Sequence, residues 1–194
     1  MGYAVKEIFK TLQGEGAQAG RPAVFCRFAG CNLACSFCDT DFTGGESHGS
    51  APALADAIEQ AWQGTPDHRF VVLTGGEPLL QVDAPLVDEL HARRFEIAIE
   101  TNGMFDAPAG IDWLCVSPKS CDGLKLRRGD ELKLVYPQAE APPEAFAQLD
   151  FRRFSLQPMD GPAVADNTAR AVAYCLAHPQ WQLSLQTHKY LGIR

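Results

Sequence analysis

Residues 69–78 read Arg69-Phe70-Val71-Val72-Leu73-Thr74-Gly75-Gly76-Glu77-Pro78, a short apolar run that ends in two glycines and a proline. Such a run, bounded by turn residues, predicts a buried strand that ends near Leu73. Helical periodicity appears on either side of it, over residues 54–62 and 85–93. Short apolar strands that alternate with helices are typical of a parallel sheet with crossover helices, so the expected fold class is α/β.

The same alternation continues through most of the chain. Gly64 should end the first helix and Asp83 should cap the second. The stretch at 102–110 is too short for a full crossover helix. Few Gly-, Pro- or Ser-rich linkers interrupt the order, so we expect one domain over residues 1–194. Further strands are expected at 23–28, 95–99, 111–116, 131–136, 153–156 and 181–186, an extra pairing strand at 4–12, and helices at 142–149 and 167–177.

Length, charge and hydropathy exclude several classes of protein. The 194 residues carry 17 Lys plus Arg against 24 Asp plus Glu, a net charge of −7, so no basic surface exists to bind nucleic-acid phosphates or an anionic membrane. The longest apolar run, residues 171–177, is far shorter than the roughly 20 residues that span a bilayer. The N-terminus lacks the apolar core of a secretory signal. We therefore expect a cytoplasmic protein with no nucleic-acid or membrane partner.

Polar residues with chemical potential follow the expected strands at their C-terminal ends. These ends lie on one edge of a parallel sheet, which is where α/β folds bind their ligands. The convergence of so many polar residues on one edge predicts a binding or active site there. The positions concerned are Cys31 and residues 74–78, 100–103, 117–119 and 157–160.

Three cysteines, Cys31, Cys35 and Cys38, lie close enough in sequence to surround one metal centre. In a reducing compartment such a group binds a metal more often than it forms disulfides. A [4Fe-4S] cluster on three cysteines leaves one iron free to bind another ligand. A structural zinc site would instead need a fourth protein ligand, and the spacing alone leaves both open. The candidates for that fourth ligand are Cys26, His48, Cys115 and Cys121.

The loop at residues 74–78 is suited to close contact with a small ligand. Gly75 and Gly76 allow the backbone to approach, and Glu77 offers an acceptor for an ammonium group. A tight turn between a strand and a helix explains the same residues equally well.

Together these two motifs resemble the radical S-adenosylmethionine (SAM) superfamily: Cys31-x3-Cys35-x2-Cys38 follows one strand, and Gly75-Gly76-Glu77-Pro78 follows the next. The chain resembles more narrowly the 7-carboxy-7-deazaguanine synthase family of that superfamily, over essentially its whole length. The resemblance implies a partial, open radical-SAM (βα) barrel with a parallel sheet and a reduced number of helices. The segments that carry it are 7–16, 25–28, 38–40, 100–103, 117–119, 131–133, 157–160 and 186–190.

This resemblance implies a carbon–nitrogen lyase of queuosine and 7-deazapurine biosynthesis. It would convert 6-carboxy-5,6,7,8-tetrahydropterin to 7-carboxy-7-deazaguanine with loss of ammonia, after a 5′-deoxyadenosyl radical abstracts the C6 hydrogen and the ring contracts. The implied cofactors are a [4Fe-4S] cluster on Cys31, Cys35 and Cys38, SAM on its fourth iron, and Mg²⁺ with Thr40 as ligand. The implied partners are a second copy of the chain and a low-potential electron donor of the flavodoxin or ferredoxin type.

The resemblance also implies two sets of binding residues. Arg27 suits the pterin carboxylate because its guanidinium binds carboxylates with two parallel hydrogen bonds, and Glu15 can accept hydrogen bonds from ring amines. Glu15 and His188 are the candidates for a direct catalytic part. For the pterin, the set is Leu12, Gln13, Gly14, Glu15, Arg27, Thr74, His188 and Arg194. For SAM, it is Phe37, Cys38, Asp39, Gly76, Glu77, Glu100, Ser117, Pro118, Lys119, Gln157, Pro158, Met159 and Asp160.

Two other functions remain open at this point. A radical-SAM activase would share the cysteine motif and the glycine loop and would make a glycyl radical on a partner protein. Residues 13–16 together with Arg27 favour a small anionic substrate instead. A non-catalytic zinc-binding module is the second alternative, but it leaves the polar residues after five strands unexplained. The cysteines outside the motif, at 26, 115, 121 and 175, are expected to act as small buried hydrophobes.

Overall fold

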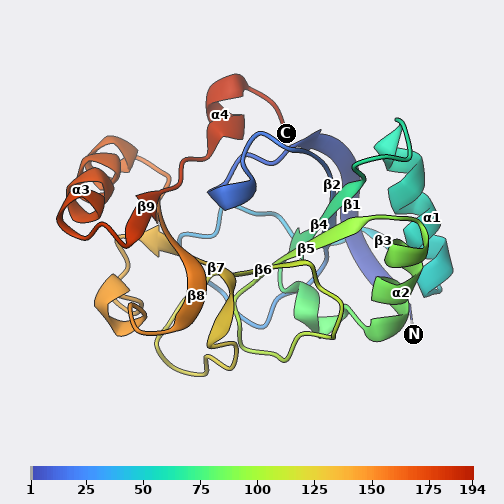
Figure 1. The fold of residues 1–194 in the computed structure, drawn as a ribbon, viewed down its shortest axis with the longest axis horizontal. Helices are drawn as coiled ribbons and strands as arrows, with labels where there is room; N and C mark the ends of the chain where they lie inside the picture. The colour runs from blue at the N-terminus through green and yellow to red at the C-terminus, as the bar shows by residue number, and fades with distance from the viewer. Residues whose placement is uncertain (1) are drawn as a thin grey trace.

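Figure 1 shows the computed structural model, which describes residues 2–194 as a mixed α/β fold built on one mostly parallel sheet. The nine strands follow the order β3-β1-β2-β4-β5-β6-β7-β8-β9. β1 pairs antiparallel with β2 and β3, whereas every pair from β2 to β9 is parallel. The strands are β1 (Tyr3–Leu12), β2 (Pro22–Phe28), β3 (Glu46–His48), β4 (Phe70–Gly75), β5 (Glu96–Thr101), β6 (Trp113–Val116), β7 (Arg128–Tyr136), β8 (Asp150–Pro158) and β9 (Trp181–Leu183).

Helices are few, as expected for an open barrel. Side-chain caps begin two of them: Ser50 Oγ accepts from Ala53 N at 3.3 Å, and Asp83 Oδ1 accepts from Leu86 N at 3.1 Å. The cap predicted at Asp83 is therefore confirmed. None of the helices within residues 2–194 is both long and apolar enough to cross a membrane. They are α1 (Ala51–Trp62), α2 (Ala84–Ala92), α3 (Val164–Ala177) and α4 (Thr187–Leu191), with 3₁₀ turns η1 (Gly16–Gln18), η2 (Pro78–Leu80) and η3 (Pro143–Ala145).

Side-chain alternation separates an outer from an inner face of the sheet. On the outer face of β2, β4 and β5, fully buried residues such as Cys26, Leu73 and Ile99 pack against Leu54 of α1 and Leu86 of α2. Figure 1 shows α1 and α2 near one end of the curved sheet and α3 beside β8 and β9 at the other. Residues one position away in each strand face inward, and these include Arg27, Thr74 and Glu100.

The second half of the sheet repeats this arrangement. Leu132 and Leu134 of β7 and Leu156 of β8 join Ala171 of α3 in a separate core cluster. Lys133 and Gln157 are in the alternate positions of the same strands and line the inner cavity with the residues from β2, β4 and β5. The apolar periodicity therefore fixes which polar side chains face the cavity.

The first helix ends as expected just before Gly64: its last residue is Trp62, and Gln63 takes the left-handed conformation at φ 45°. Three other local expectations were wrong. The helix expected at 142–149 is only the single turn η3, and the chain already enters β8 at residue 150. β9 ends at Leu183, and α4 follows where no helix was expected. As expected, no helix forms at 102–110.

The unassigned cysteines fall into two groups. Cys26 and Cys115 are buried on β2 and β6, as expected. Cys121 is exposed in the loop after β6, and Cys175 on α3 is only partly covered, so the expectation of burial was wrong for these two. Both lie outside the strand positions whose alternation dictates burial.

Candidate active site

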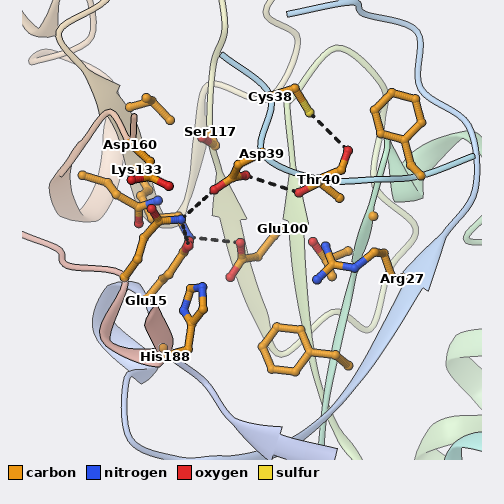
Figure 2. A pocket seen from close by; sticks show the side chains of 18 of the residues that line it. Glu15, Arg27, Cys38, Asp39, Thr40, Glu100, Ser117, Lys133, Asp160 and His188 are labelled. Atoms are coloured by element: carbon orange, nitrogen blue, oxygen red, sulfur yellow. Dashed lines mark hydrogen bonds and ion pairs between the residues drawn. The ribbon is translucent and has the colours of Figure 1, made fainter. Parts of the chain in front are cut away.

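A cavity of about 300 Å³ opens at the C-terminal ends of the parallel strands, where the polar residues were expected to meet. β2, β4 and β5 contribute Arg27, Thr74 and Glu100. Ser117 and Lys119 follow β6, Gln157 and Pro158 end β8, and Asp160 comes just after it. The loop between β2 and β3 forms one wall and α4 another. Figure 2 shows the labelled side chains turned into this space.

All three motif cysteines line the cavity, and none is in a disulfide. Leu33 N donates to Cys31 Sγ at 3.4 Å, and Cys38 Sγ lies 3.7 Å from Thr40 O. Burial raises the pKa of the Cys35 thiol; Lys119 opposes this, and the other two thiols add to it. Three free thiols that share one cavity with a partly buried lysine are a donor set suited to an iron–sulfur cluster.

In residues 2–194 no group of three or more His, Cys, Asp and Glu side chains is arranged to hold one metal ion, and this holds for the three motif cysteines as well as for a zinc site. Cys26, a candidate fourth ligand, is fully buried in the core behind β2, where burial strongly raises its pKa.

The glycine loop packs directly on the start of the cysteine loop. Gly76 N donates to Phe28 O at 3.1 Å, and Glu77 N donates to Gly30 O at 2.9 Å. A Cβ on Gly76 would lie 1.9 Å from Gly30 O, and Gly75 has φ +128°. These glycines are therefore needed to dock the two motifs against each other as well as to border the cavity.

Glu77 does not line the cavity, contrary to the interpretation of its carboxylate as an acceptor for a bound ammonium group. Its side chain is fully buried and accepts from Leu79 N at 2.9 Å, Thr101 Oγ1 at 2.7 Å and Asn102 N at 2.8 Å. Three donors from the protein occupy the carboxylate, which thereby ties η2 to the end of β5. Pro118 and Met159 are the other predicted SAM contacts absent from the residues that line the cavity within 2–194.

A closed ring of hydrogen bonds crosses the floor of the cavity. Lys133 Nζ lies 2.6 Å from Glu15 Oε2 and 3.0 Å from Glu100 Oε2. Gln13 Nε2 donates to Glu100 Oε1 at 2.8 Å, and Glu15 N donates to Gln13 Oε1 at 3.1 Å, which closes the ring. Burial alone would raise the pKa of Glu15, but Lys133 and Gln186 outweigh it and lower the pKa below its usual value. Figure 2 shows the side chains of Glu15, Glu100 and Lys133 turned toward one another.

Aromatic and cationic side chains of β1 and β2 form the opposite wall. Phe9 and Phe25 stack with ring centroids 5.5 Å apart, and both line the cavity. The guanidinium of Arg194 lies 4.4 Å from the Phe9 ring centroid. Arg27 Nε donates to Glu7 Oε1 at 2.8 Å, and Arg194 also pairs with Glu7. This wall combines a flat apolar surface with two cations, which suits a planar anionic ligand.

α4 closes the remaining side through ion pairs with the cysteine loop and the end of β8. Lys189 Nζ lies 2.8 Å from Asp39 Oδ2 and 2.6 Å from Asp160 Oδ2. Gln186 Nε2 donates to Glu15 at 2.9 Å and to Asp39 at 3.0 Å. Burial would raise the pKa of Asp39, but the hydrogen bonds from Lys189 and Gln186 lower it below its usual value.

Every other residue assigned from the resemblance borders the cavity: Leu12, Gln13, Gly14, Glu15, Arg27, Phe37, Asp39, Thr40, Thr74, Gly76, Glu100, Ser117, Lys119, Gln157, Pro158, Asp160, His188, Arg194 and the three cysteines. The sequence interpretation missed Lys133, Gln186, Lys189 and the aromatic pair. Lys133 carried a usable signal, because it is a charged residue between the apolar Leu132 and Leu134 of a buried strand. Gln186 and Lys189 lie in the segment 186–190 that the resemblance covers, but no local pattern indicated a site role for them, because their place depends on α4.

Comparison with known proteins agrees with this geometry. Residues 26–131 match the model of the Radical SAM superfamily. The chain is 65% identical to a 7-carboxy-7-deazaguanine synthase from Bradyrhizobium diazoefficiens and 61% identical to one from Bordetella pertussis, in each case over all of both chains. It also superposes on the crystal structure of QueE from Escherichia coli with a TM-score of 0.77 and 29% identity, covering 95% of this chain and 94% of that one.

Proposed function

Because the chain belongs to the 7-carboxy-7-deazaguanine synthase family of the radical SAM superfamily, we propose that it converts 6-carboxy-5,6,7,8-tetrahydropterin to 7-carboxy-7-deazaguanine and ammonia, a step toward queuosine. Family membership implies a [4Fe-4S] cluster and SAM as cofactors. One observation carries the proposal: the three motif cysteines, Arg27 and Glu15 border a single cavity. A cofactor held by the cysteines and an anionic ring held by Arg27 would then be neighbours.

In this proposal Cys31, Cys35 and Cys38 hold the cluster. When bound, the cluster and SAM would supply a 5′-deoxyadenosyl radical that abstracts the C6 hydrogen, after which the ring contracts and ammonia leaves. The residues that border the cavity beside the cysteines would hold SAM: Phe37, Asp39, Gly76, Glu100, Ser117, Lys119, Gln157, Pro158 and Asp160. Their hydroxyl, amide and carboxylate groups suit the polar atoms of a nucleoside and an amino acid.

The pterin would lie against Phe9 and Phe25. The Nη atoms of Arg27 would bind its carboxylate, since the contact with Glu7 uses only Nε. Glu15, ionised beside Lys133, would accept from the ring amines at the other end. His188 approaches from α4 because Gly14 has no side chain: a Cβ there would lie 2.3 Å from His188 Nδ1. Leu12, Gln13, Thr74 and Arg194 complete the proposed contacts.

Thr40 is the proposed ligand for Mg²⁺. Its Oγ1 lies 3.4 Å from Asp39 Oδ1 and borders the cavity, and such hard oxygen donors are what Mg²⁺ prefers. The ion would share the substrate carboxylate and keep several waters. Titration of Mg²⁺ into the wild-type enzyme and Thr40→Ala, with turnover as the readout, would test this assignment.

We further propose a homodimer that works in the cytoplasm with a low-potential electron donor of the flavodoxin or ferredoxin type. Exposed apolar residues on α3 and α4 support the dimer, among them Leu176 at 79% and Leu191 at 62% exposure. A reducing compartment suits free cluster thiols. Light scattering on the purified protein would give the number of copies.

The test is an anaerobic incubation of the cluster-reconstituted protein with SAM, a strong reductant, Mg²⁺ and the pterin, followed by mass spectrometry. The proposal predicts 7-carboxy-7-deazaguanine and ammonia. If 5′-deoxyadenosine forms without the deazapurine, the substrate assignment is wrong. The protein would then be better explained as a radical-SAM activase that makes a glycyl radical on a partner protein. A protein that holds stoichiometric zinc and no iron would instead favour the interaction module.

A further inference from the structure

The segment Glu131-Leu132-Lys133 of β7 supplies no contact to SAM or to the pterin in the function proposed above, where Lys133 serves only as the partner of Glu15. Leu132 packs in the core behind the sheet, so Glu131 and Lys133 both face the interior. Their side chains are among the least exposed charged groups of the protein, with Glu131 at 2% and Lys133 at 4%. Each contacts the segment at residues 13–18, called here the substrate loop.

Glu131 holds the backbone of the substrate loop. Its two carboxylate oxygens accept from Ala17 N at 3.0 and 3.2 Å, and Ser155 Oγ donates to it at 2.5 Å. Gly16 makes the contact close, because a Cβ at this position would lie 2.8 Å from both oxygens. Gly16 N is bound in turn by Ser184 Oγ at 2.8 Å. The loop backbone is therefore held by a buried carboxyl group.

Lys133 holds the side chains of the same loop. Its ammonium bridges Glu15 of the loop and Glu100 of β5, and Gln13 completes the ring on the other side. Glu15 belongs to the proposed pterin contacts and Glu100 to the proposed SAM contacts. The lysine thus stands between the two halves of the cavity and fixes the distance between their carboxylates.

We propose that Glu131 and Lys133 are positioning residues, which hold the substrate loop so that Gln13 and Glu15 are oriented for the pterin before it binds. This inference rests on the proposed function for the identity of the ligand, but the contacts with the loop do not depend on it. Preorganised loops bind more tightly because less conformational freedom is lost on binding. Without Lys133, two partly buried carboxylates would face each other with no cation between them.

The first experiment measures pterin binding to the cluster-reconstituted, SAM-loaded enzyme by calorimetry. Lys133→Met should raise the Kd by about tenfold or more, Lys133→Arg should recover part of the loss because it keeps the charge, and the exposed Lys125→Met should match wild type. The cluster absorbance should stay unchanged in all of them. A Lys133→Met enzyme with wild-type affinity would overturn the proposal.

The second experiment needs no ligand and stays informative if Lys133→Met does not fold. Hydrogen exchange of the substrate-loop amides is compared between wild type, Glu131→Gln and the exposed control Glu46→Gln. Both carboxylate oxygens of Glu131 accept from Ala17 N, whereas the side chain of a glutamine has only one oxygen. The amides of residues 16 and 17 should therefore exchange faster in Glu131→Gln and not in the control. Unchanged exchange would overturn the proposal. If the wild-type enzyme bound no pterin, the proposed function would be wrong. Hydrogen exchange of the substrate-loop amides would still show whether Glu131 holds the loop.

Discussion

Glu7 and Arg27 are direct partners across the antiparallel β1–β2 pair, and Glu7 Oε1 accepts a 2.8 Å hydrogen bond from Arg27 Nε. The guanidinium makes no further hydrogen bond within residues 2–194, so both Nη atoms are available to the cavity. Its orientation is thus set by a cross-strand pair rather than by the ligand. The two Nη atoms of Arg27 are therefore already oriented to bind the carboxylate of a ligand at this wall.

Arg27→Ala should abolish turnover while leaving the cluster absorbance intact. Arg27→Lys should restore little, because an ammonium cannot form two parallel hydrogen bonds with a carboxylate and also pair with Glu7. Steady-state kinetics with varied pterin would check both, with a KM increase of about tenfold or more expected for the lysine variant. Wild-type kinetics in Arg27→Ala would remove this residue from the substrate site.

Cys35→Ala should lose the cluster and all SAM cleavage but keep its secondary structure. Cys121 is the matched control, because it is an exposed thiol outside the motif. Iron and sulfide analysis, visible absorbance and the yield of 5′-deoxyadenosine provide the measurements. A full cluster in Cys35→Ala, or its loss in Cys121→Ala, would show that the ligands are assigned wrongly.

Gly14→Ala should weaken pterin binding without unfolding the protein. The new methyl group would lie 2.3 Å from His188 Nδ1 and force α4 or the substrate loop to shift. Gly49 provides the control, since a Cβ there meets nothing within 4 Å. The prediction requires a raised pterin Kd in Gly14→Ala and a wild-type value in Gly49→Ala; equal affinities would contradict it.

The ion pair between α4 and the cysteine loop should make stability depend on acid pH. Asp39 has a folded pKa below its ordinary 3.8 because its hydrogen bonds from Lys189 and Gln186 outweigh burial. The stabilisation is therefore complete above about pH 5 and declines as pH falls through the folded value. Lys189→Met should have a lower Tm than wild type at about pH 6 to 8, where Asp39 is ionised. The Tm values of the two proteins should converge as the pH falls into the acid range. We would measure Tm against pH on cluster-free protein; a difference that does not depend on pH would contradict the prediction.

Strand periodicity predicted the fold class, and the polar residues at the strand ends predicted the edge of the sheet that holds the cavity. Thr74 and Glu100 belong to those strand-end groups, whereas Arg27 and most of the other lining residues were assigned from the family resemblance. The cysteine loop was evident from spacing alone. Where two motifs lie on neighbouring parallel strands, the topology brings them together, and the Gly76–Gly30 contact is the result.

The remaining features depend on contacts between distant segments, which no local pattern reports. Glu77 looked like a ligand contact, but Thr101 and Asn102 at the end of β5 take its carboxylate. Lys189 reaches Asp39 and Asp160 only because α4 folds back over the cavity. The helix expected at 142–149 is reduced to η3 because β8 begins at Asp150, three residues before the strand expected there.

The most direct test of the central claim follows one atom. The proposed reaction requires SAM and the pterin to share one cavity, with C6 of the pterin next to the radical. With pterin deuterated at C6, the 5′-deoxyadenosine formed by the wild-type enzyme should carry deuterium, and 7-carboxy-7-deazaguanine should accumulate with it. If 5′-deoxyadenosine contained only protium and no deazapurine appeared, the cavity would not perform the proposed reaction.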